Sequence, residues 1–133
     1  MATITRRQKS LTLIRAREVA TNLALPIAVL DPEGAIVFYN EAAEAIFGDT
    51  FESVGEVSSD AWAAAFSPER EDGSPIPRHE LPGGVALLER RPHHLDLCYT
   101  GIDGIRRKVA VTAFPLMGRE GELFGAFTIF WHL

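Results

Sequence analysis

The stretch that decides the fold is residues 25–48, LPIAVLDPEGAIVFYNEAAEAIFG. Two short apolar runs, residues 26–30 and 35–39, flank an Asp-Pro-Glu-Gly sequence. This pattern predicts two strands joined by a turn, because proline presets φ and glycine accepts positive φ. Asn40 then precedes an alanine-rich stretch and predicts a helix cap, while Gly48 stands where helices commonly end in a left-handed residue. The segment therefore predicts a hairpin followed by a short capped helix.

Composition places limits on the whole chain. With 133 residues, of which 47% are hydrophobic, we expect one domain with its own core. The net charge of −5 argues against a general nucleic-acid binder, which needs a basic face. The single cysteine, Cys98, excludes an internal disulfide framework and favours a reducing, cytoplasmic location. No apolar run approaches the roughly 20 residues of a membrane-spanning helix.

The N-terminal segment, residues 1–22, is basic and predicts an amphipathic helix. Thr5 and Gln8 have the spacing of a capping box. The apolar positions of this helix are Leu11, Leu13 and Ile14. An Arg-rich transit peptide is the alternative, but a helix that runs without a break into the first strand favours a docking role. We expect it to cover a sheet or to mediate dimerisation.

The last apolar run, residues 123–133, has two apolar faces. One face holds Phe124, Ala126, Thr128 and Phe130, and the other holds Phe127, Ile129, Trp131 and Leu133. An antiparallel strand with one solvated face should alternate apolar with polar residues, so something must cover the second face. The N-terminal helix or a second copy of the chain could do so. The predicted interface residues are Leu11, Ile14, Phe127, Ile129 and Trp131.

The middle of the chain predicts further strands and short helices. Residues 105–116 alternate as a strand, and glycine-containing turns at 101–104 and 118–121 indicate a three-stranded antiparallel meander. Before it, Ser59 or Asp60 is expected to cap a helical turn. Pro82 suits the first turn of a second helix. The adjacent glycines after it cost helix stability of roughly 1 kcal/mol each, which suggests close packing or mobility.

The order of these features resembles a PAS domain. A strand, an acidic glycine-containing turn, a second strand, an Asn before a short helix and a closing Gly are typical of the opening of that family. The DGSPIP sequence at 72–77 and the helical LPGGVALLERR at 81–91 resemble its loop and long pocket helix. The resemblance covers residues 23–133. It implies an α+β fold with a five-stranded antiparallel sheet, short helices on one face and, here, an extra N-terminal helix.

The resemblance also implies a cavity. The helix face formed by Leu81, Val85 and Leu88 would look into a ligand pocket opposite the sheet. The candidate pocket residues are Trp62, Phe66, Leu81, Val85, Leu88, Leu95, Leu97, Val109 and Val111. A tightly filled core remains the alternative, because apolar helix faces usually form core.

Cofactor chemistry has little support in the sequence. His79 and His93 are the candidate haem ligands, although His79 falls in the loop before the pocket helix. His93 and His94 are adjacent on a predicted strand and face opposite ways, which disfavours a shared metal ion. The flavin-binding branch of the family carries a reactive Cys in an Asn-Cys-Arg-Phe-like helix, which is missing here. The sequence disfavours haem, flavin and metal and leaves the identity of a cofactor open.

Catalytic motifs are also missing, since there is no phosphate-binding glycine loop and no Gly-x-Ser-x-Gly elbow. Glu41 and Glu44 share a helix face and are interpreted as solvated. The sequence therefore predicts a non-enzymatic signalling module, which we expect to be bacterial in type, cytoplasmic and homodimeric. Two hypotheses remain: a sensor of a small apolar or mixed ligand that signals through the sheet and N-terminal helix, or a ligand-free module for dimerisation or partner docking.

The resemblance leaves the output of the module open. Family members often continue from the last strand into a signalling helix, whereas this sequence stops at Leu133. The effector is therefore expected to be a partner protein or a domain attached outside these residues.

Overall fold

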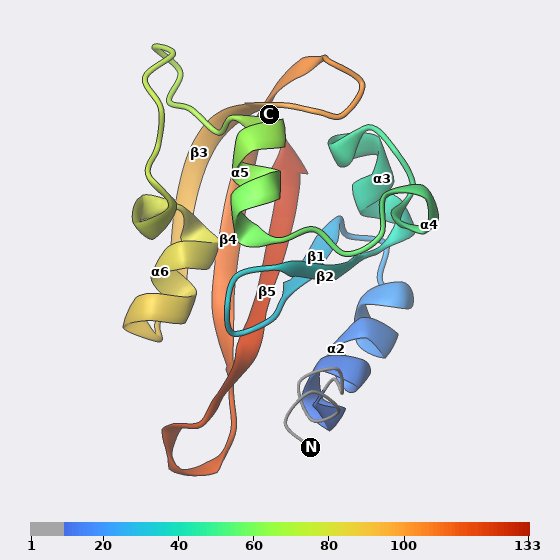
Figure 1. Cartoon of the computed structure of the whole chain (residues 1–133), viewed down its shortest axis with the longest axis vertical. Helices are drawn as coiled ribbons and strands as arrows, with labels where there is room; N and C mark the ends of the chain where they lie inside the picture. The colour runs from blue at the N-terminus through green and yellow to red at the C-terminus, as the bar shows by residue number, and fades with distance from the viewer. Residues whose placement is uncertain (1–9) are drawn as a thin grey trace.

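A five-stranded antiparallel sheet organises the computed structural model, which describes residues 10–133 (Figure 1). The strands are β1 (Ile27–Leu30), β2 (Ile36–Tyr39), β3 (His93–Thr100), β4 (Arg106–Met117) and β5 (Leu123–His132). Their spatial order is β2-β1-β5-β4-β3, and every neighbouring pair is antiparallel. The predicted hairpin and the predicted three-stranded meander are both confirmed. The predicted capping box at Thr5 and Gln8 lies outside the described residues.

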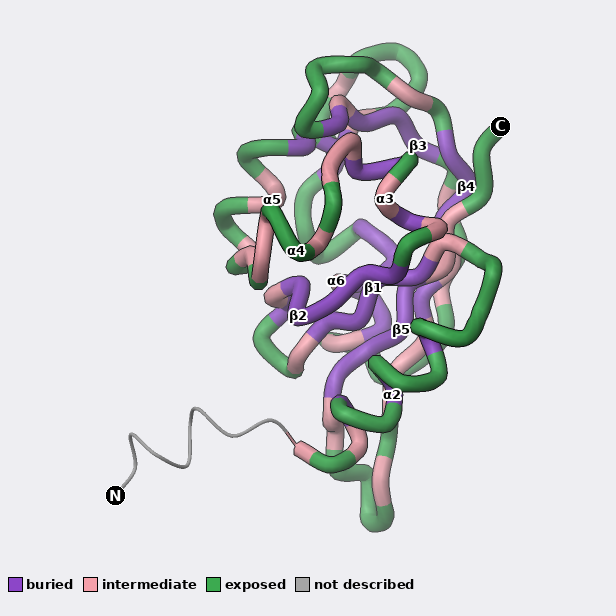
Figure 2. The backbone as a smooth tube through the Cα atoms, turned by 90° about the vertical axis from the view of Figure 1, so that its right-hand side faces the viewer, coloured by how far each residue is buried: buried purple, intermediate pink, exposed green. Residues whose placement is uncertain are grey.

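Short helices cover both faces of the sheet. They are α2 (Leu11–Thr21), α3 (Glu41–Phe47), α4 (Phe51–Val54), α5 (Ser59–Phe66) and α6 (Pro82–Glu89), with 3-10 turns η1 (Arg78–Glu80) and η2 (Arg119–Gly121). Residues of α3, α5 and α6 share one buried cluster with the sheet, and α2 shares a second cluster with its opposite face. The predicted α+β fold is confirmed. Figure 2 shows that the buried backbone is concentrated in the strands.

The opening hairpin and the helix after it follow from local side-chain hydrogen bonds. The Asp31 carboxylate accepts hydrogen bonds from the amides of Glu33 (2.9 Å) and Ala35 (3.0 Å), which closes the turn between β1 and β2. The Asn40 side-chain oxygen accepts a hydrogen bond from the amide of Ala43 at 3.1 Å, as a helix cap should. Gly48 ends α3 with φ of +90°. The predicted cap and the predicted left-handed glycine are confirmed.

Asn40 also connects three other segments. Its side chain is 2% exposed, and its oxygen accepts a second hydrogen bond from the amide of Ile27. Its amide donates to the carbonyls of Ala20 (2.9 Å) and Leu25 (2.7 Å), with a longer contact to Leu23 (3.3 Å). One buried side chain therefore links the end of α2, the segment before β1, β1 itself and the start of α3.

The helix α2 covers the far face of β1 and β5. Its buried residues, Leu13, Ala16 and Ala20, recur at helical spacing and pack in one cluster with Phe127. The Arg17 guanidinium lies over the ring of Phe38, 4.6 Å from its centroid. The prediction that the second face of β5 is covered is confirmed for its first half.

Leu11 and Ile14 do not cover the sheet. Their side chains are exposed, because the helix turns the face of Leu13 and Ala16 toward the sheet instead, and their role in a dimer interface stays a prediction. The helix ends at Thr21, where Asn22 donates its backbone amide to preceding carbonyls, so it does not run without a break into β1.

The cap of α5 also differs from the prediction. Ser58, rather than Ser59 or Asp60, accepts the hydrogen bond from the Ala61 amide at 3.2 Å. Ser58 is the residue directly before the helix, so its side-chain oxygen can reach the free amide of Ala61 in the first turn. Ser59 and Asp60 already belong to that first turn. Pro82 occupies the first turn of α6, as predicted.

Single residues from loops pair with both edge strands. Val57 and Ile36 on β2 exchange backbone hydrogen bonds of 2.8 and 3.0 Å. Glu69 and Cys98 on β3 exchange two of 2.8 Å each. The loop after α5 is thereby held against the sheet, and the Cys98 thiol is buried.

Candidate functional site

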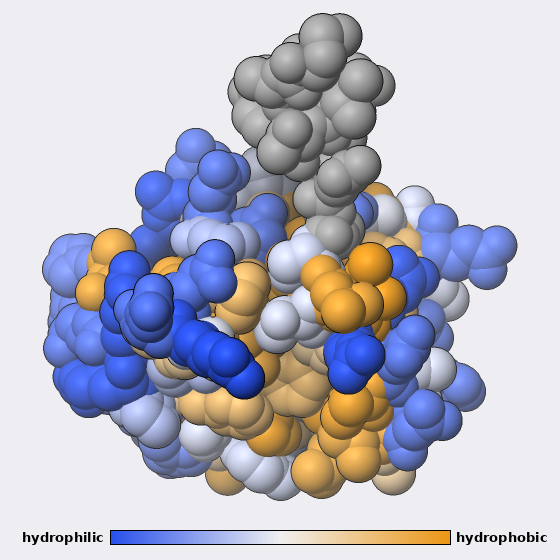
Figure 3. Space-filling model, turned by 90° about the horizontal axis from the view of Figure 1, so that it is seen from below, coloured by the Kyte–Doolittle hydropathy of each residue, from blue (hydrophilic) through white to orange (hydrophobic). Residues whose placement is uncertain are grey.

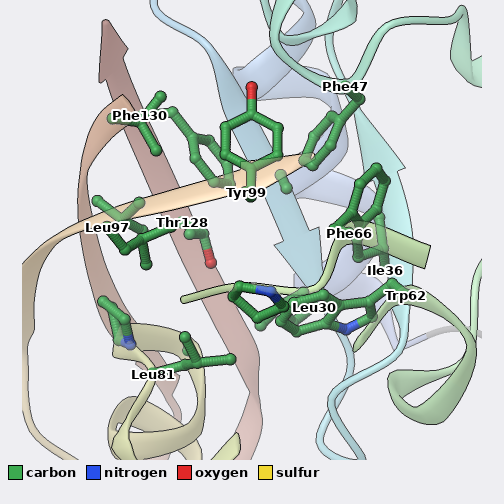
Figure 4. A pocket seen from close by; sticks show the side chains of 16 residues that line it. Leu30, Ile36, Phe47, Trp62, Phe66, Leu81, Leu97, Tyr99, Thr128 and Phe130 are labelled. Atoms are coloured by element: carbon green, nitrogen blue, oxygen red, sulfur yellow. The ribbon is translucent and has the colours of Figure 1, made fainter. Parts of the chain in front are cut away.

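An apolar cavity of about 70 Å³ lies between the sheet and the α5–α6 side of the molecule (Figure 4). We call it the inner cavity. Residues from the first hairpin, α3, α5, α6 and the closing meander surround it, so its walls depend on nearly every element of that layer. Its lining residues are Ala28, Leu30, Ile36, Phe47, Trp62, Phe66, Pro68, Leu81, Pro82, Gly83, Leu97, Tyr99, Val109, Val111, Thr128 and Phe130.

Six of the nine predicted pocket residues line this cavity. They are Trp62, Phe66, Leu81, Leu97, Val109 and Val111. Val85 is buried but does not line the cavity, and Leu95 is partly buried against the same core cluster without lining it. The placement of Leu88 is wrong, because its side chain is 70% exposed.

The error at Leu88 comes from the phase of the helix. The buried residues of α6 are Pro82, Gly83, Val85 and Ala86. Since each residue advances an α-helix by about 100°, Leu88 lies far around the helix from the centre of that face. The sequence predicted that Leu81, Val85 and Leu88 lie on one face of the helix. Val85 lies at the edge of the buried face, and Leu88, one turn later, lies outside that face.

The two glycines of α6 allow close approach of the helix to its neighbours. A Cβ atom at Gly83 would lie 2.7 Å from Cδ1 of Leu30, and one at Gly84 would lie 1.9 Å from the carbonyl oxygen of Arg78. The first contact is with a side chain that can move, whereas the second is with backbone. The glycine pair is therefore explained by close packing, one of the two interpretations that the sequence suggested.

The polar atoms of the nearby aromatic side chains are directed to backbone carbonyls. The Tyr99 hydroxyl donates to the carbonyl of Ile46, and the Trp62 indole N–H donates to the carbonyl of Gly34 at 3.1 Å. Burial raises the pKa of Tyr99, so its hydroxyl stays protonated at neutral pH. These rings therefore present carbon to the inner cavity.

The second tyrosine of the chain lies in the same core cluster. The Tyr39 hydroxyl donates to the carbonyl of Asp49 at 2.9 Å. Burial, with smaller effects of the Asp49 and Glu44 charges, raises the pKa of Tyr39 to about 12. Neither tyrosine is therefore suited to act as a proton acceptor near neutral pH.

Thr128 is the exception in this apolar lining. Its side chain is 6% exposed, and its hydroxyl oxygen Oγ1 is the one buried side-chain polar atom without a hydrogen-bond partner among residues 10–133. Figure 4 shows this oxygen pointing away from β5 into the cavity. Sequence reasoning placed Thr128 on the correct face of β5 but did not select it as a site residue. The signal was available, since Thr128 is the single polar residue among Phe124, Ala126, Thr128 and Phe130 on that face.

A larger groove adjoins the inner cavity. It has a volume of about 420 Å³ and shares three lining residues with the cavity, namely Leu30, Trp62 and Gly83. Its other walls include Glu33, Arg78, His79, Leu87 and Leu88. The Arg78 guanidinium pairs with the Asp60 carboxylate at 2.8 Å. The charged side chains of this outer groove stand outside the apolar space.

The candidate haem ligands do not reach the inner cavity. His79 is exposed in η1 and borders the outer groove, and His93 is not among the lining residues. Ligand sites for drug-sized molecules usually measure about 300 Å³ or more, so a cavity of about 70 Å³ does not fit a porphyrin or a flavin ring. Within the described part of the chain, no three metal-ligating side chains cluster.

His94 lies on the other face of β3 from the cavity residues. Its Nδ1 is 2.6 Å from the Thr112 hydroxyl, and its Nε2 is 3.3 Å from the Asp96 carboxylate. All three side chains belong to the sheet face that carries α2, away from the inner cavity. Among residues 10–133, no helix has the length and apolar character that a bilayer crossing requires.

Comparison with known proteins places this geometry in a family. A family model described as PAS fold matches residues 20–133. A comparison with curated proteins finds no match. The structure is similar to the PAS domain of BvgS from Bordetella pertussis, with 23% sequence identity over 91% of this chain and 84% of that chain and a TM-score of 0.58.

Two further solved structures support the fold at lower identity. The PAS domain of nitrogen regulation protein NR(II) from Vibrio parahaemolyticus has 16% identity over 94% of this chain and 100% of that chain, with a TM-score of 0.61. The PAS domain of the fruit-fly ELK potassium channel has 8% identity over 93% and 98%, with a TM-score of 0.70. At such identities the similarity concerns the fold.

Proposed function

Because the chain belongs to the PAS family, a family of sensory and interaction modules, we propose that it is a signalling sensor that binds a small apolar or mixed ligand in the inner cavity. The observation that carries this proposal is the cavity itself. It is lined by residues of all five strands and of the helices α3, α5 and α6, and removal of apolar ligand surface from water is favourable by roughly 25 cal/mol per Å². A ligand there would contact β5, whose other face packs against α2.

Transmission through β5 follows from the alternation of its side chains. Thr128 and Phe130 line the inner cavity, while Phe127 and Ile129 contribute to the cluster that holds α2. A ligand that shifts β5 therefore changes the surface on which α2 rests. It acts by population shift, which requires the ligand to bind one arrangement of β5 and α2 better than the other.

A second route runs through Asn40. It caps α3, whose last residue Phe47 lines the inner cavity, and its amide donates to the carbonyl at the end of α2. The proposed division of labour is thus a docking segment at 1–22 and a sensing domain at 23–133. The proposed setting is cytoplasmic signalling of the bacterial type, with the effector on a partner protein or on a domain attached to this one.

Native mass spectrometry of the full chain, compared with its denatured mass, tests the proposal. We expect an added mass that disappears on denaturation, and hydrogen exchange should show altered protection in α2 when that mass is removed. A captured ligand with no change in α2 would contradict transmission through this helix. A clean protein mass, together with failure of small-molecule probes to bind, would contradict ligand sensing and favour the second candidate.

That second candidate is a ligand-free module for homodimerisation or partner docking. It is supported by apolar side chains that stay exposed on α2 and on the end of β5, namely Leu11, Ile14, Val19, Trp131 and Leu133. Figure 3 views the molecule from below and shows hydrophobic residues gathered on that side, whereas the C-terminus lies toward the top of Figure 1. Exposed apolar patches are typical of interaction surfaces. A homodimer is compatible with either candidate.

A further inference from the structure

We propose that the inner cavity selects small neutral molecules carrying one hydroxyl or carbonyl group, and that the Thr128 hydroxyl is the residue that recognises this group. The inference rests on the proposed function, because it specifies the ligand of the same cavity. It is carried by the juxtaposition of a space lined by carbon with one unpartnered buried oxygen.

The state of Thr128 indicates that a partner is supplied from within the cavity. Its Oγ1 is buried and has no hydrogen-bond partner among the described residues. Buried polar groups in native proteins are nearly always paired, and an unpaired hydroxyl costs about 1–3 kcal/mol. The side chain faces the cavity rather than the backbone of a neighbouring strand. A ligand hydroxyl or carbonyl at that point would complete its hydrogen bonding.

The charge of the ligand follows from what does not line the cavity. Among the described residues that line the cavity there is no Asp, Glu, Lys, Arg or His. An ionised group moved into such a space would lose its hydration without gaining a counter-ion, which is far more costly than burying a neutral polar group. The charged residues nearby, such as Arg78 and Glu33, border the outer groove instead. The ligand is therefore neutral in the cavity.

The size of the ligand follows from the volume. A single water needs about 10–15 Å³ of such space, and an engineered cavity of about 150 Å³ binds benzene or xenon. A cavity of about 70 Å³ therefore takes a molecule of about four to six non-hydrogen atoms. Short alcohols and ketones such as 1-butanol and butanone belong to this class.

The position of Gly83 keeps the space near Thr128 open. A Cβ atom at Gly83 would lie 3.8 Å from Oγ1 of Thr128, so any larger side chain would compete with a ligand for the hydroxyl. Gly83 and Leu30 belong to the wall between the inner cavity and the outer groove. The polar group of the ligand would thus meet Thr128 next to the wall through which the outer groove adjoins the cavity.

The test is a comparison of three probes against the full chain and two variants. The probes are 1-butanol, its apolar isostere pentane and the charged butyrate. Binding of each probe is measured from the changes in NMR chemical shift of the backbone amides of Thr128, Phe130 and Val109. Thr128→Val removes the hydroxyl at constant shape, and Thr128→Ser keeps it. In the native protein we expect 1-butanol to bind and butyrate not to bind. In Thr128→Val the affinity for 1-butanol should fall about tenfold relative to that for pentane, while Thr128→Ser should retain the preference.

The outcomes separate this inference from the proposed function. If the ratio of the affinities for 1-butanol and pentane is the same in the native protein and in Thr128→Val, recognition by Thr128 is overturned. Ligand binding in the cavity would remain intact. Binding of butyrate as tight as that of 1-butanol would overturn the neutral class. Failure of all three probes to shift cavity resonances would overturn both proposals. If Thr128→Val does not fold, the same comparison is made with Thr128→Ala, and the probe series in the native protein still decides between neutral and charged ligands.

Discussion

At the scale of single residues, Asn40 both caps α3 and ties α2 to β1. Its oxygen accepts from two amides and its amide donates to carbonyls at the end of α2 and before β1. An aspartate could perform the capping task alone. An amide side chain can cap the helix with its oxygen and also donate hydrogen bonds to carbonyls with its nitrogen. A carboxylate cannot donate, and its second oxygen would be repelled by those carbonyl oxygens.

We therefore expect Asn40→Asp to lower the free energy of unfolding by about 2–4 kcal/mol, since it buries a charge against the carbonyls of Ala20 and Leu25. Urea unfolding followed by fluorescence measures the change. The matched control is Asn22→Asp, at an exposed position where the side-chain amide donates only to the Glu18 carbonyl. If the two variants lost similar stability, the linking role of Asn40 would be refuted.

Residue-level prediction succeeded where local chemistry was decisive. Asn40 and Gly48 could be read from the sequence, because capping and positive φ depend on a few neighbouring residues. Thr128 could be placed on a face but not identified as unpartnered. That property depends on how β5, α6 and the first hairpin pack together, which alternation along one strand does not specify.

At the scale of elements, the docking of α2 depends on small residues. Ala16 and Ala20 let the helix approach the sheet closely, while the Arg17 guanidinium holds its outer side over the rings of Phe38 and Phe51. A helix of 11 residues is marginal on its own in water, so most of its stability comes from this contact.

Ala16→Glu should therefore detach α2, because a carboxylate would be buried between the helix and the strands. We expect a loss of about 3 kcal/mol or more, or, if the helix swings free, loss of hydrogen-exchange protection over residues 11–21. Ile14→Glu, on the exposed side of the same helix, is the control and should retain both. Full protection of α2 in Ala16→Glu would contradict the observed packing.

Element boundaries show which patterns carry information. The bounds of β1, β2, β4 and β5 were predicted to within a residue or two, because apolar runs and turn residues mark both ends. Helix phase was harder. The stripe chosen for α2 contained one buried residue, Leu13, and the stripe chosen for α6 contained two, Leu81 and Val85, while Leu88 is exposed. Several apolar residues on a short helix permit more than one stripe.

At the scale of the whole molecule, one sheet separates two different environments. On one side the sheet and the helices α3, α5 and α6 enclose the inner cavity, and on the other α2 covers only part of the strands. Trp131, paired with Ala110 across the sheet, stays 39% exposed beyond that cover. The proposed homodimer would use this uncovered area.

Trp131→Glu should convert such a homodimer to a monomer, because each interface would then bury two unpaired carboxylates. Native mass spectrometry over a range of protein concentrations gives the oligomeric state directly. Leu88→Glu is the matched control, since Leu88 is an exposed apolar residue on the opposite side of the sheet. An identical distribution of oligomers in both variants would argue against an interface at Trp131.

Composition and length predicted one domain, whose sheet carries a buried cluster on each face, and the combined pattern of motifs predicted the family. The cavity volume could not be anticipated. The rotamers of one or two side chains decide whether the core is filled or contains a cavity of this size. These rotamers depend on packing among residues that are far apart in the sequence.

The two loop residues that pair with the outer strands have a consequence for how this protein can assemble. An open sheet normally offers unpaired backbone groups at both margins, which invite strand-by-strand growth into aggregates. Here Val57 occupies backbone groups of β2, and Glu69 occupies backbone groups of β3. Addition of a further strand must first displace a loop. Association through a face of the sheet is thereby favoured over growth at its edges, and an isologous contact of that kind closes at two copies.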